Sequence, residues 1–177
     1  FINWANQHFP QVSINLYSGK DWMTDHLDQW SQEEARITGE KPIILPLLDP
    51  LLDATKPLHK LLLIGEAEEI QALYRAIRAD DFPSTAFYLS KTNYLEVTAK
   101  HVSKEDALIE LANHYHLSLE EVLTMGDNFN DLPMLKKAGI GVAMGNAPQE
   151  VKEGAAIVTK TNNENGAGQA VETYVLI

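Results

Sequence analysis

The stretch Thr124-Met125-Gly126-Asp127-Asn128-Phe129-Asn130-Asp131 decides the fold of this chain. The apolar run 122–125 ends abruptly in Gly126 and Asp127, and a second acid, Asp131, follows four residues later. An amphipathic segment, 132–138, comes next and is stopped by a glycine. This pattern predicts a buried strand, a tight loop with two carboxylates, and a helix. Ligands of open α/β sheets bind at the carboxyl ends of strands, and two acids there suit a hard cation such as Mg²⁺.

The sequence around this loop, over residues 100–177, alternates between helical and strand patterns. Ser103 and Asp106 form a capping signature for a first helix, and Ser118 with Glu121 repeats that signature before the strand at 122–125. Further strands are expected at 140–144 and 156–159, and further helices at 148–154 and 168–175. The first helix carries one apolar stripe at helical spacing: Ala107, Leu108, Leu111, Ala112 and Tyr115. Short apolar strands separated by helices predict a parallel sheet with right-handed crossovers.

The first half of the chain, residues 1–99, has a different pattern. Residues 12–17 alternate apolar and polar, which predicts a strand with one wet face. A helix is expected over 23–37, and the segment 42–57, with four prolines, is expected to be irregular. The remaining expected elements are a strand at 60–64, a helix at 68–79, and strands at 85–89 and 94–98 joined by a hairpin turn. The first half is therefore predicted to be an α+β module with an antiparallel sheet, incomplete at its start, and the boundary lies within 98–102.

The composition excludes several classes of protein. The 177 residues carry a formal net charge of −11, divided as −6 in residues 1–99 and −5 in residues 100–177. Neither half offers a basic face, so no nucleic-acid partner is expected. The chain has no cysteine, which removes thiolate zinc sites and cysteine nucleophiles and fits a cytoplasmic location. No apolar run approaches the roughly 20 residues that span a bilayer, so no membrane association is expected.

Four residues are the candidates for chemistry. Asp127 follows a strand end, as a metal ligand would, although an aspartate there can also cap the next helix. Asn130 can donate its amide to a phosphoryl oxygen or merely occupy a turn. Asp131 can bind a metal directly or support its site, or it can merely favour the first turn of the helix electrostatically. Lys104 is the first residue of its helix, where a cation opposes the helix dipole by roughly 0.3–1 kcal/mol. A bound phosphate would relieve that misfit, whereas the alternative is a solvated lysine.

Other polar or aromatic residues are weaker candidates. His114 and His116 are two positions apart on a helix, do not share a face, and are expected to be exposed. The three tryptophans, Trp4, Trp22 and Trp30, are expected in the core or in an interface. The loop Asn146-Ala147-Pro148 is predicted at the same sheet edge as Asp127, where it either buttresses the site or only turns the chain.

Three motifs in the second half carry a resemblance to a known family. They are Val102-Ser103-Lys104-Glu105-Asp106-Ala107-Leu108, then Gly126-Asp127-Asn128-Phe129-Asn130-Asp131-Leu132-Pro133-Met134-Leu135, then Gly141-Val142-Ala143-Met144-Gly145-Asn146-Ala147. Together they closely resemble the Cof-type branch of the haloacid dehalogenase superfamily. The similarity extends from about residue 94 to residue 175, and the first half resembles the mobile cap of that branch.

This resemblance implies the C-terminal part of a Rossmann-like α/β core, preceded by a cap that closes over the leaving group and sets specificity. The implied activity is Mg²⁺-dependent hydrolysis of small phosphorylated metabolites such as sugar phosphates. By resemblance, Lys104 stabilises the phosphoryl group and the nucleophile, Asp127 binds the metal, Asn130 contacts phosphate, and Asp131 supports the metal site.

The sequence departs from that family at the nucleophile. The family uses the first aspartate of an Asp-x-Asp pair, and this chain contains no such pair. Asp49 comes nearest to the first aspartate of this pair, but the residue two positions later is Leu51 and not an aspartate. Pro46 also argues against a central strand before it. We therefore expect the nucleophile to lie outside this chain, in an N-terminal segment that completes the core, and the chain to be an inactive fragment as it stands.

Two further readings compete with the phosphatase. The first is a non-catalytic module that binds a phosphorylated ligand or another protein. The second is a receiver-like signalling domain, which is disfavoured because its acids and lysine would appear in a different order.

Overall fold

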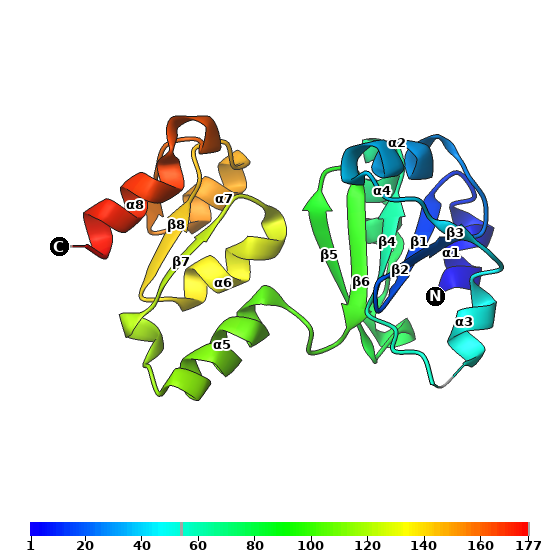
Figure 1. Ribbon diagram of the computed structural model, residues 1–177, viewed down its shortest axis with the longest axis horizontal. Helices are drawn as coiled ribbons and strands as arrows, with labels where there is room; N and C mark the ends of the chain where they lie inside the picture. Colours follow the sequence, from blue (N-terminus) through cyan, green and yellow to red (C-terminus); the bar gives the residue numbers. More distant parts are fainter. Residues whose placement is uncertain (54, 177) are drawn as a thin grey trace. The chain divides into compact units, whose positions relative to one another are not determined.

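The computed structural model describes residues 1–53 and 55–176, which form two compact units, Phe1–His101 and Val102–Ile177 (Figure 1). The boundary between the two units, after His101, lies inside the range 98–102 that the sequence pattern indicates. Each unit contains its own sheet. No helix within the described ranges combines the length and apolar character that crossing a membrane requires.

The first unit is built on a six-stranded sheet with the order β3-β2-β1-β4-β6-β5. Its strands are β1 (Ser13–Ser18), β2 (Asp21–Thr24), β3 (Ile43–Ile44), β4 (Lys60–Ile64), β5 (Thr85–Lys91) and β6 (Tyr94–Ala99). All neighbouring pairs are antiparallel except β2 and β3, which are parallel. Its helices are α1 (Ile2–His8), α2 (Gln29–Thr38), α3 (Leu48–Leu52) and α4 (Ala67–Ala76), with a 3-10 turn η1 (Ala79–Asp81).

Helices cover both faces of this sheet. The main core lies on one face, where Ala5 of α1 and Leu73 of α4 pack with Leu63 and Leu95 of the central strands. Successive side chains of a strand point to opposite faces, so Leu62 and Ile64 lie on the other face, where Trp30 of α2 packs against them. Burial on both faces explains why residues 61–64 of β4 are all apolar and do not alternate with polar residues.

Several expectations for this unit are wrong. The polar face of β1 is not wet, because Ser13 and Asn15 are only 1% and 0% exposed. Asn15 is satisfied inside the protein, since its amide donates to the Leu62 carbonyl at 3.3 Å and its oxygen accepts from the Trp22 ring N–H at 2.8 Å. Polar alternation in this strand therefore marks a buried hydrogen-bond network rather than a solvated face.

The start of the helix that the sequence predicts over 23–37 is also wrong. Residues 21–24 pair with β1 as β2 through a turn at Gly19, whose φ of +57° favours glycine. The helix begins only at Gln29, because the Asp28 carboxylate caps it by accepting the Ser31 N–H at 2.7 Å. The segment 42–57 is not wholly irregular, since it contains β3 and α3, and α1 was not anticipated.

The second unit carries a parallel sheet with the order β7-β8-β9. Its strands are β7 (Leu123–Gly126), β8 (Ile140–Ala143) and β9 (Ile157–Val158). Its helices are α5 (Lys104–Tyr115), α6 (Leu132–Lys137), α7 (Gln149–Gly154) and α8 (Gly166–Tyr174), with 3-10 turns η2 (Leu119–Glu121), η3 (Phe129–Asp131) and η4 (Asn162–Glu164). The alternating α/β order is the one that the sequence pattern predicts.

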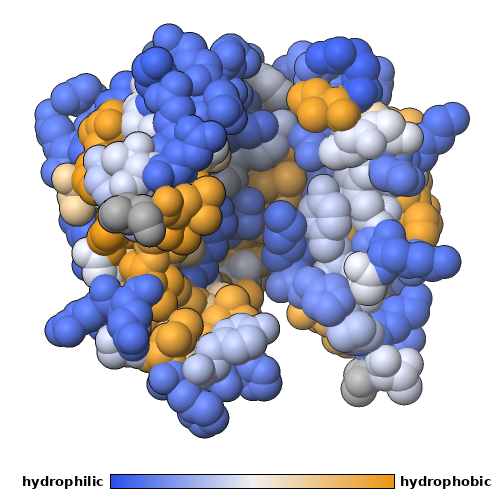
Figure 2. Space-filling view, turned by 60° about the vertical axis from the view of Figure 1, so that its left-hand side comes forward, coloured by the Kyte–Doolittle hydropathy of each residue, from blue (hydrophilic) through white to orange (hydrophobic). Residues whose placement is uncertain are grey.

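The apolar stripe of α5 is only partly buried. Leu108 and Ala112 are 8% and 5% exposed, whereas Leu111 and Tyr115 are 56% and 66% exposed. Figure 2 shows patches of hydrophobic residues (orange) among hydrophilic ones (blue) on the surface. The stripe therefore extends beyond the contacts that α5 makes within the described part of the unit.

Candidate active site

The candidate site lies at the carboxyl end of β7. Gly126 is the last residue of that strand, Asp127 follows it, and the chain then turns through η3 into α6. The apolar strand ends at Gly126, and the polar residues that follow it form the turn that leads into α6. Asp127 is exposed, whereas Asp131, at the end of η3, is 3% exposed.

The Asp131 carboxylate organises the loop from inside. Its Oδ2 accepts the backbone N–H of Asp127 at 2.8 Å and that of Asn128 at 2.9 Å. The side chain lies so close to the strand end that a Cβ placed on Gly126 would be 2.3 Å from the Asp131 Cβ. Glycine is therefore required at position 126 by the close approach of this side chain.

Lys104 approaches the same carboxylate from another element. Ser103 caps α5, because its hydroxyl accepts the Asp106 N–H at 2.9 Å, and this makes Lys104 the first helical residue. The Lys104 Nζ donates a hydrogen bond to Asp131 Oδ1. The Lys104 side chain is 50% exposed while that of Asp131 is 4% exposed, so the ammonium group remains open to a ligand.

Asp127 and Asn130 present their polar groups differently. The Asp127 Oδ2 accepts a hydrogen bond from Asn146 Nδ2 at 3.3 Å, and Asn146 follows β8 on the loop before α7. No donor among residues 1–53 and 55–176 reaches Asp127 Oδ1. Asn130 lies in η3 and is partly buried, and its side-chain amide bonds to none of the described residues. These two groups are available to a ligand.

The structure thus brings Lys104, Asp127 and Asp131 together at one sheet edge, and Asn130 lies in the same loop. It adds Asn146, whose loop the sequence places at this edge without choosing between a supporting role and a turn. His114 and His116 are exposed on and after α5. Trp22 is 6% exposed, and Trp4 and Trp30 pack at the margins of the first unit's cores.

The donor set at this edge fits a hard divalent cation. The free Oδ1 of Asp127 is an oxygen ligand of the kind that Mg²⁺ prefers, and Mg²⁺ commonly takes only one or two carboxylates and completes its shell with water and phosphate oxygens. Asp131 has less capacity for direct coordination, because its two oxygens already accept three hydrogen bonds. Within the ranges that the structure describes, no cluster of three or more histidine or acidic side chains forms a complete metal cage.

Comparison with known proteins places the chain in a family. A family model of haloacid dehalogenase-like hydrolases matches residues 1–171. A protein of Haemophilus influenzae, provisionally named a phosphatase, is 38% identical to this chain over 172 residues. The match covers 97% of this chain and 63% of that protein. A 5-amino-6-(5-phospho-D-ribitylamino)uracil phosphatase of Bacillus subtilis is 45% identical over 87 residues, which cover 49% of this chain and 34% of the relative.

Solved structures agree with that placement. The crystal structure of a haloacid dehalogenase-like hydrolase from Bacteroides thetaiotaomicron matches with a TM-score of 0.75 and 30% identity, covering 97% of this chain and 64% of that one. A protein from Thermotoga maritima matches with a TM-score of 0.71 and 31% identity over 97% of this chain and 63% of its own. The chain thus spans less than two thirds of these relatives. It belongs to the haloacid dehalogenase-like hydrolases.

Proposed function

We propose that this chain is the cap and the C-terminal part of the core of a Mg²⁺-dependent phosphatase that acts on small phosphorylated metabolites such as sugar phosphates in the cytoplasm. The observation that supports this proposal is the contact of the Lys104 ammonium with the Asp131 carboxylate, directly beside Asp127 at the end of β7. A cation from one element and an acid loop from another meet where a phosphate ester and its metal would bind.

The charges at the site support the same ligand. Two carboxylates and one ammonium leave a net charge of −1 at the loop, which would repel a phosphate dianion. A bound Mg²⁺ would reverse that sign and polarise a phosphoryl oxygen. Asp127 would hold the cation through Oδ1, and Asp131 would hold Asp127 and Lys104 in place. Phosphate binding should therefore depend on a divalent cation.

The remaining residues position the phosphoryl group. Lys104 can bind a phosphoryl oxygen as a compact point charge, since half of its side chain is exposed. Asn130 can donate its free amide to a second oxygen. Residues 1–99 would act as the cap, which excludes water from the reacting groups and chooses the leaving group.

The nucleophile in this proposal is an aspartate carboxylate from outside the chain. Its oxygen would bond to phosphorus while the bond to the ester oxygen breaks, and the second carboxyl group of the Asp-x-Asp pair, also outside this chain, would give the leaving oxygen its proton. Water would then attack the phosphorus of the aspartyl phosphate and lose a proton to that second carboxylate, which releases inorganic phosphate and restores both carboxyl groups to their starting states. Lys104 would stabilise the added negative charge in both steps.

The test is an assay of the protein together with the segment that supplies the nucleophile. With Mg²⁺ and a panel of phosphomonoesters, release of inorganic phosphate is expected. Lys104→Ala and Asp127→Ala should each lower kcat by a factor of at least about 10²–10³, since each removes a charge at the reacting group. Lys136→Ala, on the exposed surface of α6, is the matched control and should keep the parent rate.

Two results would count against this function. Full activity in either site variant would show that the residues are assigned wrongly. Complete absence of turnover by a folded protein with Mg²⁺ would favour the non-catalytic module that binds a phosphorylated ligand or a protein.

A further inference from the structure

The side chain of Asn146 connects the Asp127 carboxylate to a third loop. Its Nδ2 donates to Asp127 Oδ2 at 3.3 Å, and its Oδ1 accepts the backbone N–H of Asn162 at 3.0 Å. An asparagine amide can turn by 180° to exchange its oxygen and nitrogen. Here the Asn162 donor needs an oxygen opposite it, so the NH₂ group must face Asp127.

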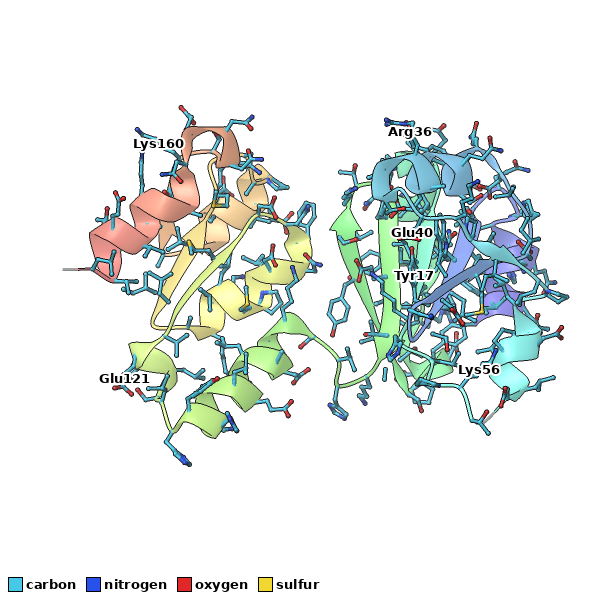
Figure 3. All side chains as sticks on the ribbon, in the orientation of Figure 1. Tyr17, Arg36, Glu40, Lys56, Glu121 and Lys160 are labelled. Carbon is cyan, nitrogen blue, oxygen red and sulfur yellow. The ribbon has the colours of Figure 1, made fainter. Side chains whose placement is uncertain are left out.

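The loop that supplies Asn162 is itself tightly held. Gly145 N–H donates to the Lys160 carbonyl at 3.0 Å, and a Cβ at Gly145 would be 2.7 Å from the Thr161 backbone nitrogen. The Thr161 hydroxyl donates to Glu164 at 2.6 Å, which fixes the start of η4. Lys160, labelled in Figure 3, marks the position of this loop on the second unit.

We infer that Asn146 is a positioning residue for Asp127. By occupying Oδ2 it fixes the rotation of the carboxylate and leaves Oδ1 as the one oxygen free for a cation. The residue acts through Asp127 and does not itself touch the substrate. This inference rests on the proposed function, because it assumes that Asp127 is the metal ligand.

Asn146 also connects the site to the η4 turn. The hydrogen-bonded series from Glu164 through Thr161 and the neighbouring Asn162 to Asn146 ends on Asp127. Outer hydrogen-bond partners of metal ligands typically change metal affinity by 10–100-fold when they are removed. The same size of effect is expected here.

The experiment measures binding of Mn²⁺ alone to this chain, with Mn²⁺ as a paramagnetic probe for the divalent cation. The Kd is obtained from the free-ion electron paramagnetic resonance signal in the parent and in three variants. Asn146→Ala should raise the Kd about 10-fold, and Asp127→Ala should abolish binding. Asn163→Ala, an exposed residue of the neighbouring η4 turn, is the matched control and should leave the Kd unchanged. Thermal melting without metal confirms that each variant is folded.

The outcomes separate the inference from the proposed function. If Asp127→Ala abolishes binding but Asn146→Ala binds as well as Asn163→Ala, the positioning role is wrong and the metal site stands. If Asp127→Ala binds Mn²⁺ as tightly as the parent, the metal site itself is wrong. A purely structural role would lower the melting temperature of Asn146→Ala without changing the Kd, and this result would also overturn the inference.

Nuclear magnetic resonance of the unmodified protein gives a second measurement. The side-chain amide signals of Asn146 are identified by their loss in Asn146→Ala. Asp127→Ala should shift them, because they lose their acceptor, and should leave the Asn163 side-chain signals in place. Unchanged Asn146 signals in Asp127→Ala would show that the hydrogen bond is absent in solution.

Discussion

At the scale of single residues, the site depends on the missing side chain of Gly126. An added Cβ would lie 2.3 Å from the Asp131 Cβ, so Gly126→Ala must displace the carboxylate that holds the loop. We expect a loss of stability of about 1–3 kcal/mol and weaker Mn²⁺ binding, measured by urea unfolding and titration. Gly65→Ala is the control, because its nearest contact would be the Val12 side chain at 3.4 Å, an ordinary van der Waals distance. Equal stability of the two variants would contradict the account of the loop.

At the scale of elements, one buried pair joins α2 to β6. The Tyr94 hydroxyl donates to Glu34 Oε2 at 2.7 Å, and the two residues are 8% and 9% exposed. Burial, followed by this hydrogen bond, raises the pKa of the Tyr94 phenol. Tyr94→Phe should cost about 1–3 kcal/mol, because it leaves a buried carboxylate oxygen without its donor. Urea unfolding compares this cost with that of Tyr74→Phe, a substitution at a residue that is 39% exposed. Similar midpoints for the two variants would show that the pair contributes little.

At the scale of the whole molecule, the two units have separate cores. Leu63 belongs to the core of the first unit and Leu135 to that of the second, and each is at most 2% exposed. Replacing either leucine by alanine should lower the free energy of unfolding by about 2–5 kcal/mol. The loss of stability should be confined to the unit that contains the replaced leucine. Hydrogen exchange should therefore speed up in β4 and β6 for Leu63→Ala, and in β7 and β8 for Leu135→Ala. Faster exchange in both units of either variant would show that they unfold together.

Much of the second unit could be predicted because its signals are local. A strand that ends in Gly-Asp and a capped helix that starts at Ser103 are visible within a few residues of sequence. The contact of Lys104 with Asp131 spans 27 positions, and only the alternating α/β order and the family resemblance suggested it. The choice between support and turn for Asn146 depended on Asn162, 16 positions away, which no local pattern could supply.

The first unit was harder to predict because its short elements depend on tertiary contacts. The strand β2 has four residues and β3 has two, which is too few for a periodic pattern to form. The polar residues of β1 alternate as on a solvated strand, yet Asn15 is wholly buried with Trp22 as its partner. The apolar stripe of α5 was placed correctly on one helix, but the sequence alone could not show that Leu111 would remain exposed.

The pinned loop after β7 has a thermodynamic consequence for recognition. Fixing the backbone of one residue costs roughly 1–2 kcal/mol of conformational entropy. Because the Asp131 side chain already holds the amides of Asp127 and Asn128, that ordering takes place during folding. Under the proposed function, a phosphate ester that binds together with its cation would meet a loop that is already ordered, and its association free energy would carry little penalty for immobilising the loop.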